Sequence, residues 1–203
     1  MALLNTFARL WLTGLRSQGG RVLLLAFVLA GCVVPRAAAQ TTPSREYQIK
    51  AVFLFNFIQF VEWPPTAFPD DSTPIRIGVL GDDPFGPALE EAVRGESVRN
   101  RPLVVRRAHR IEDLEDCQLL FICKSEQRKL NDILSFLGTR PVLTVSEVTG
   151  FTRQGGIIAF YQDGKKVRFE INPSTAQKSG LKLSSQLLGL GRIVGAETVK
   201  EDS

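Results

Sequence analysis

The chain has 203 residues, with 25 Lys and Arg against 21 Asp and Glu, which gives a formal net charge of +4. Residues 1–39 hold four arginines and no acidic residue, so residues 40–203 carry 21 basic and 21 acidic side chains. A body without net charge excludes the basic surface that general nucleic-acid binding requires. With 44% hydrophobic residues, 13 of the 203 being Phe, the chain is also too apolar for disorder and long enough to bury one core.

The first 39 residues are typical of an export signal. Arginines precede an apolar run over residues 22–34, and Ala37-Ala38-Ala39 then offers a signal-peptidase site, so we predict a signal peptide over residues 1–39. The run is shorter than the roughly 20 residues that span a bilayer. An alternative reading remains, because Leu29-Ala30-Gly31-Cys32 resembles a lipobox. In that case the signal ends at residue 31 and Cys32 carries the lipid of a membrane-anchored lipoprotein facing the periplasm.

The mature chain begins with a predicted helix that starts at Ser44 and is ended by Pro64-Pro65. At 100° per residue one broad face is apolar and contains Phe53, Leu54, Phe57, Phe60 and Val61. The opposite, polar face includes two apolar residues, Val52 and Phe55, which points weakly to a partner surface. We take Val52, Phe55 and Trp63 as candidate partner-binding residues, with simple coverage by neighbouring segments as the alternative for the first two and a packed helix stop for Trp63.

Strands and helices then alternate along the chain. Such alternation predicts a mainly parallel sheet with flanking helices. The expected strands are residues 75–80, 103–107, 117–123 and 142–148, and the expected helices are residues 84–94 and 125–137. Residues 157–162 and 167–172 read as an antiparallel hairpin with Asp163-Gly164 at its tip.

The C-terminal part completes the domain. A short segment over residues 172–180 leads to a small strand at 181–183 and to a last helix over 184–194, with Ser184 or Ser185 as N-cap. The prediction is therefore one α/β domain over residues 44–195, followed by a flexible tail over residues 196–203.

Two cysteines remain after removal of the signal, Cys117 and Cys123, and both lie at the ends of one predicted strand. Six residues of strand span roughly 20 Å, whereas disulfide-bonded Cα atoms lie within about 7 Å. The two cysteines are therefore not expected to pair within one chain. Burial as small apolar side chains is the simplest reading, with a reactive thiol or a bond between two chains as the alternative.

Few residues point to chemistry. His109 is the single histidine and follows a strand, so no Ser-His-Asp or Cys-His site can be built without it. The loop with Asp82, Asp83 and Phe85 follows a strand of an α/β sheet, where ligands often bind, and we keep it as a candidate ligand loop. Acidic residues at a helix start also have a structural explanation. We expect no enzyme, no cofactor and no metal site.

Several segments in order resemble the YfiR/HmsC family of periplasmic proteins. They are EYQIKAVFLFNFIQFVEWPP, IRIGVLGDDPFG, DCQLLFIC, RPVLTVSE and VRFEIN followed by LKLSSQLLGLGRIV, and together they cover residues 46–194. The resemblance implies a non-enzymatic regulator that binds the periplasmic domain of an inner-membrane diguanylate cyclase and inhibits it, which lowers cyclic-di-GMP signalling and biofilm formation. It also implies an OmpA-like outer-membrane lipoprotein as a second partner.

The chain departs from this family at one position. Family members often carry a cysteine where this chain has Gly78, and that cysteine pairs with the one at the position of Cys117. The cross-link is therefore expected to be absent here, which puts redox control in doubt. A homodimer stays open, and so does a second function, a periplasmic module that binds a small ligand and serves a sensor kinase or a transporter.

Overall fold

The computed structural model describes residues 44–195. The predicted signal peptide, the alternative lipoprotein signal with Cys32, and the predicted tail after Gly195 lie outside the described residues. Within residues 44–195, no helix has the combined length and apolarity needed to cross a membrane.

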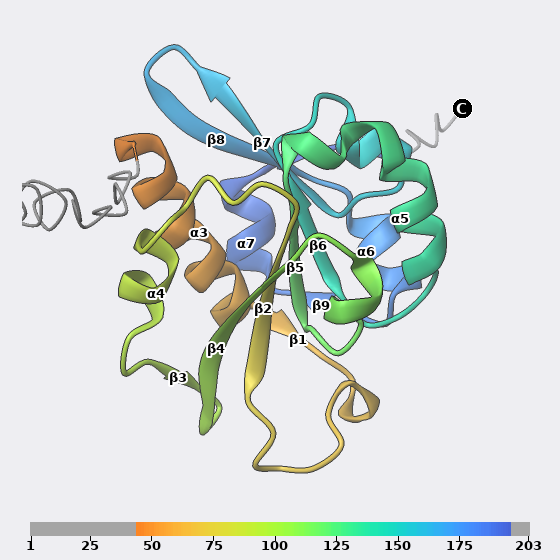
Figure 1. Ribbon diagram of the computed structural model, residues 1–203. Helices are drawn as coiled ribbons and strands as arrows, with labels where there is room; N and C mark the ends of the chain where they lie inside the picture. The colour runs from red at the N-terminus through yellow and green to blue at the C-terminus, as the bar shows by residue number, and fades with distance from the viewer. Residues whose placement is uncertain (1–43, 196–203) are drawn as a thin grey trace, which may run out of the picture. The chain divides into compact units, whose positions relative to one another are not determined.

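One sheet of eight strands organises the domain, in the order β10-β8-β7-β6-β5-β2-β4-β3 (Figure 1). Its strands are β2 (Ile75–Leu80), β3 (Ser97–Val98), β4 (Arg101–Ala108), β5 (Leu119–Ile122), β6 (Leu143–Ser146), β7 (Ile158–Asp163), β8 (Lys166–Ile171) and β10 (Arg192–Ile193). Strands β4, β2, β5, β6 and β7 are parallel, whereas β7 and β8 form an antiparallel hairpin. The predicted fold class, a mainly parallel α/β sheet with a C-terminal hairpin, is confirmed.

Helices cover both faces of this sheet. One core cluster joins the sheet to α3 (Arg45–Phe60), α4 (Ala88–Val93) and α7 (Ser185–Leu190), and the other joins it to α5 (Leu130–Leu137). Successive strand side chains point to opposite faces, so Val79 of β2 packs in the first cluster and Leu80 in the second. The central strands are buried on both faces, which explains why their sequences are continuous apolar runs.

The first helix is shorter than predicted. It ends at Phe60, and the next two residues form strand β1 (Val61–Glu62), which pairs with β9 (Lys182–Leu183) in a separate two-stranded sheet. The register places Val61 opposite Leu183. The helical apolar period continues through these residues, but pairing with the distant C-terminal strand satisfies their backbone instead.

Other differences concern element ends. Helix α4 begins at Ala88 rather than at residue 84, because Gly86 has a positive φ of 51° and interrupts any earlier helical turn. Residues 124–129 form a 3₁₀ helix before α5. The segment after Asn172 contains an unpredicted helix, α6 (Pro173–Lys178), in which the Asn172 side chain accepts a hydrogen bond from Thr175 N–H. Ser184 is the N-cap of α7, one of the two predicted choices.

Candidate functional site

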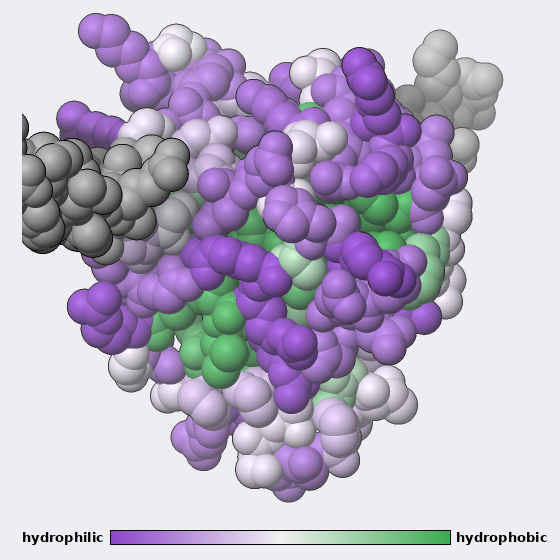
Figure 2. Space-filling model, viewed as in Figure 1, coloured by the Kyte–Doolittle hydropathy of each residue, from purple (hydrophilic) through white to green (hydrophobic). Residues whose placement is uncertain are grey.

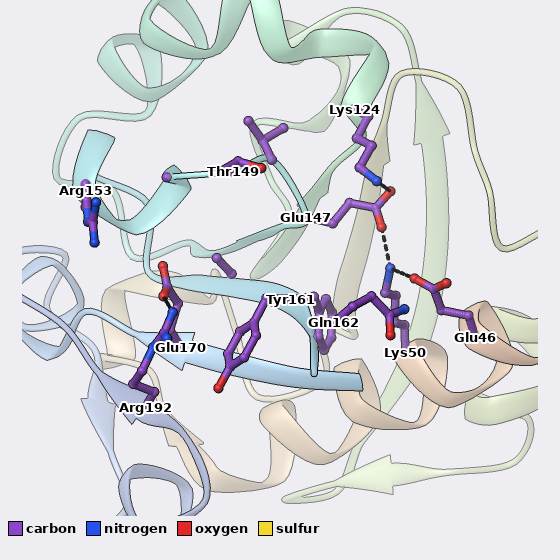
Figure 3. A pocket seen from close by; sticks show the side chains of 14 residues that line it. Glu46, Lys50, Lys124, Glu147, Thr149, Arg153, Tyr161, Gln162, Glu170 and Arg192 are labelled. Carbon is purple, nitrogen blue, oxygen red and sulfur yellow. Dashed lines mark hydrogen bonds and ion pairs between the residues drawn. The ribbon is translucent and has the colours of Figure 1, made fainter. Parts of the chain in front are cut away.

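A cavity of about 370 Å³ lies at the end of the sheet where β5 and β6 finish. Side chains from the start of α3, from the segment after β6 and from strands β7 and β8 line it (Figure 3). Parallel strands leave their carboxyl ends at one edge of a sheet, and that edge is where open α/β folds most often hold ligands. The volume falls within the range of small-molecule pockets.

A buried lysine forms one wall of this cavity. Lys50 of α3 is 3% exposed and donates hydrogen bonds to Glu46, one helical turn earlier, and to Glu147, which follows β6. Figure 3 shows this chain of ion pairs continuing to Lys124, whose Nζ lies 3.8 Å from Glu147 Oε1. A buried ammonium group is stable only with such partners, because desolvation disfavours its charge. The network therefore ties the start of α3 to the carboxyl end of β6.

Tyr47 supports the same carboxylate. Its hydroxyl donates a 2.9 Å hydrogen bond to Glu147 Oε1, and its ring lies 4.6 Å from Lys50 Nζ in a cation–π contact. Burial, together with the hydrogen bond to the negatively charged Glu147, raises the pKa of Tyr47. The hydrogen bond from Lys50 lowers the pKa of Glu46. Glu46 is thus stabilised in its ionised form.

A second charged cluster lies on the other side of the cavity. Glu170 of β8 accepts hydrogen bonds from Thr152 and from Arg192, and the Arg192 guanidinium lies 4.5 Å from the ring centre of Tyr161. Burial of Glu170 opposes its ionisation, but the two hydrogen bonds prevail and lower its pKa. Figure 3 shows Tyr161 between the two clusters. The cavity thus offers an aromatic surface between two sets of fixed charges.

The charged side chains of the cavity are arranged to bind a ligand rather than to activate a nucleophile. Each acidic side chain of the cavity wall already has a cationic partner, and Arg153, also in the lining, forms no ion pair within residues 44–195. No three side chains in the described part of the chain cluster as metal ligands. The sequence reading missed this site, although one signal was present. Lys50 falls on the apolar side of the first helix, and a lysine there requires a buried partner.

The structure separates the three candidate partner-binding residues. Val52 is 51% exposed on the outer side of α3, whereas Phe55 is half-buried against the core. Trp63 is also half-buried, and its Nε1 donates a 3.1 Å hydrogen bond to the backbone oxygen of Gln118. Trp63 therefore has a structural role, and Val52 is the residue of the three that is open to a partner.

The exposed apolar surface is divided rather than continuous. On the face shown in Figure 2, hydrophobic areas are small and separated by polar side chains. The most exposed large apolar residues of the described domain are Ile49, Val52, Val104, Leu190 and Ile193. Two of them, Ile49 and Val52, lie one turn apart on α3.

The polar groups of the candidate ligand loop have partners within the domain. Asp83 accepts a hydrogen bond from Phe85 N–H and pairs with Arg107. The backbone N–H of Asp82 donates a 3.0 Å hydrogen bond to Ser125 Oγ. Phe85 belongs to the same loop but does not face solvent. Its side chain is fully buried, with its ring 4.7 Å from that of Phe121. Asp82 stays exposed, but none of the three residues lines the cavity.

The two cysteines are free and buried, as predicted. Burial raises the pKa of the Cys117 and Cys123 thiols to about 12. A thiol with so high a pKa is almost wholly protonated near neutral pH and reacts slowly. His109 is exposed after β4, as expected for a loop histidine.

Comparisons with known proteins identify relatives of this domain. A family model described as YfiR/HmsC-like matches residues 47–192, which is nearly the whole described domain. A crystal structure of a conserved domain protein from Vibrio cholerae O1 biovar El Tor has the same fold, with a TM-score of 0.50 and 11% identity. The match covers 71% of this chain and 60% of that protein's length. No curated protein sequence matches the chain.

Proposed function

The chain belongs to the YfiR/HmsC-like family, and on this basis we propose that it binds the periplasmic domain of an inner-membrane diguanylate cyclase and inhibits it. The single observation that carries the proposal is the family match over residues 47–192. Proteins of this family are periplasmic and regulatory rather than catalytic. The proposal has two further parts. An OmpA-like outer-membrane lipoprotein binds this chain and so competes with the cyclase for it, and the chain forms a homodimer.

The absence of net charge on residues 40–203 supports recognition of the partner through short-range contacts rather than through long-range electrostatic attraction. Residues 40–203 are neutral overall, so steering by net charge contributes little to association. Affinity then depends on a few apolar anchors. Val52 and its neighbour Ile49, both exposed on α3, are the anchors that we propose. Phe55 supports them from its half-buried position beside the core.

Val52→Asp is expected to weaken partner binding by about tenfold or more, because it places a charge where an apolar contact forms, and 1.4 kcal/mol corresponds to a factor of ten. The thermal melt should stay within about 1 °C of the wild type, since the side chain is 51% exposed. The measurement is a titration against purified periplasmic domains of the membrane-bound diguanylate cyclases of the source organism.

Ile193→Asp is the matched control, because Ile193 is 42% exposed and lies on the edge strand β10 rather than on α3. It should bind the cyclase domain like the wild type. If both variants bind equally well, α3 is not the contact surface. If no cyclase domain binds the wild type, and if cellular cyclic-di-GMP is unchanged when the gene is deleted, the proposed function itself is wrong.

The cavity favours a second candidate function, a module that binds a small charged ligand. Its two charged clusters and the ring of Tyr161 supply fixed polar contacts and an apolar surface, as ligand sites usually do. Calorimetric titration with a panel of small charged metabolites is then expected to give saturable heat that Tyr161→Ala removes. If a metabolite binds and no complex with a cyclase domain forms, this second function is favoured. If no metabolite of the panel gives heat, it is contradicted.

A further inference from the structure

Within residues 44–195, the outer edge of β4 has no strand beside it over most of its length. Strand β3 pairs with β4 only at Arg101 and Pro102, which face Val98 and Ser97. From Leu103 to Ala108, β4 pairs with β2 alone. In Figure 1, β4 lies at the border of the sheet, with only the short β3 beyond it near its start. An edge of this kind can accept another strand.

The hydrogen-bond pattern shows which groups face outward. Gly81 N–H donates to Ala108 O at 2.9 Å, so the backbone groups of Ala108 point toward β2. The direction alternates along a parallel strand, and Val104 and Arg106 therefore also point inward. Val105 and Arg107 direct their N–H and C=O groups to the outer edge, where the described part of the chain supplies no strand to pair with them.

Arginine side chains are concentrated around this edge. Residues 94–110 contain six arginines and a single acidic residue, although residues 40–203 as a whole are neutral. Four of the six, Arg101, Arg106, Arg107 and Arg110, pair with acidic side chains of neighbouring segments, whereas neither Arg94 nor Arg99 forms an ion pair within residues 44–195. Such a charge distribution opposes pairing with a second copy of the same edge, because like charges directly opposite are destabilising.

The side chains of β4 indicate what an added strand would contact. Val104 is 41% exposed, and Arg106, two residues later on the same face, pairs with Asp116 at 3.2 Å. Both members of this ion pair are close to half exposed, at 45% and 44%, so the pair contributes little and can be exchanged for another carboxylate. A strand added beside β4 therefore fits best if it has an apolar residue next to Val104 and an acidic residue next to Arg106.

We propose that the outer edge of β4, from Val105 to Arg107, accepts an extended acidic segment of a protein partner as an additional strand. Backbone hydrogen bonds from the partner provide affinity, and a carboxylate facing Arg106 provides selectivity. The inference rests on the proposed function in one respect, that the chain acts by holding a protein. It adds the surface and the chemistry of the segment that is held.

Short synthetic peptides test the inference without a cyclase. One peptide alternates valine and glutamate, a second has lysine in place of glutamate, and a third is the glutamate peptide with alternate backbone amides N-methylated. Amide chemical shifts of the domain over residues 44–195 report binding. We expect the glutamate peptide to bind about tenfold more tightly than the lysine peptide, with shifts at Val105 and Arg107, and the N-methylated peptide not to bind.

Arg106→Glu should reverse the preference between the glutamate and lysine peptides, and Arg106→Gln should remove it, with the thermal melt of each variant as a check on folding. Equal binding of the two charged peptides, binding of the N-methylated peptide, or shifts that map away from β4 would overturn the inference. So would a dimer of the wild type that buries this edge, detected by sedimentation. If the peptides bind as expected but no cyclase domain does, the proposed function fails and the edge site stands.

Discussion

Gly78→Cys is expected to form a disulfide with Cys117 and to stabilise the domain by about 4 kcal/mol, the chain-entropy value for a closed loop of roughly 40 residues. Gly78 lies in β2, and Cys117 lies two residues before β5, the strand that pairs with β2. A Cβ at residue 78 would lie 3.0 Å from Cys117 Sγ and 3.4 Å from Cys117 Cβ. A disulfide with an S–S length of about 2.05 Å places each Cβ about 3 Å from the opposite sulfur, so the bond fits with little movement.

Mass spectrometry and urea unfolding of the oxidised and reduced variant provide the measurement. Gly78→Ser is the matched control, because it adds a side chain of similar size, 3.0 Å from Leu120 Cδ1, without a cross-link. The oxidised cysteine variant should unfold at a higher urea concentration than both the reduced variant and the serine variant. Equal stability of the oxidised and reduced forms would contradict the prediction.

This geometry gives the family resemblance a physical meaning. The resemblance implied a cross-link between the positions of Gly78 and Cys117, and the structure places these positions in contact. The present chain has space for the disulfide but lacks one of its two cysteines. Burial raises the pKa of the Cys117 and Cys123 thiols to about 12. We therefore expect its stability not to respond to reducing agents.

Glu147→Leu is expected to destabilise the fold by about 3–5 kcal/mol, the usual result of removing one partner from a buried ion pair. Lys50 is left with Glu46 alone, whose side chain is 36% exposed, and Tyr47 loses its acceptor. Lys50→Met should cost a similar amount, because Glu147 then keeps only Tyr47 and the 3.8 Å contact with Lys124. The double variant should lose much less than the sum, because no buried charge lacks a partner.

Urea unfolding of the two single variants and the double variant gives the coupling energy directly. Glu46→Gln is the control, since it removes the exposed member of the network and should cost at most about 1 kcal/mol. Additive losses in the double variant would contradict the model of one coupled network.

The pH dependence of stability has a defined sign. In the folded protein Lys50 lowers the pKa of Glu46 below its ordinary value of 4.5. The contribution of Glu46 to stability is therefore fully present above pH 4.5 and is lost as the pH falls through the lowered pKa.

Local pattern was sufficient for much of the fold but not for the site. Strand β2 was predicted with its observed ends, because an apolar run of six residues lies between turn-forming segments. Helix α6 was missed, since its six residues show no clear apolar period and its N-cap at Asn172 is a weak signal on its own. The predicted first helix extends beyond Phe60, the observed end of α3, because Val61 and Glu62 pair with β9 instead.

The Lys50 network could not be assembled from sequence for a different reason. Its two main members are 97 positions apart, and only the sheet order brings the end of β6 beside the start of α3. The direction of the Phe85 side chain could not be read from the sequence for a related reason. Its loop follows a strand end, as ligand loops do, but the ring turns inward and packs against Phe121. Strand-end position locates a loop and does not determine the direction of each side chain.

The pairing of β1 with β9 has a consequence for the order of folding. Helix α3 leads the described domain and packs against α4, but it also depends on the end of the chain: Val61, which follows it, pairs with Leu183, Ser184 N–H donates to Phe60 O, and the rings of Phe53 and Phe169 are 5.6 Å apart. Contacts between such distant residues form late. The packing of this first helix is therefore completed only when the last segment of the domain has been made.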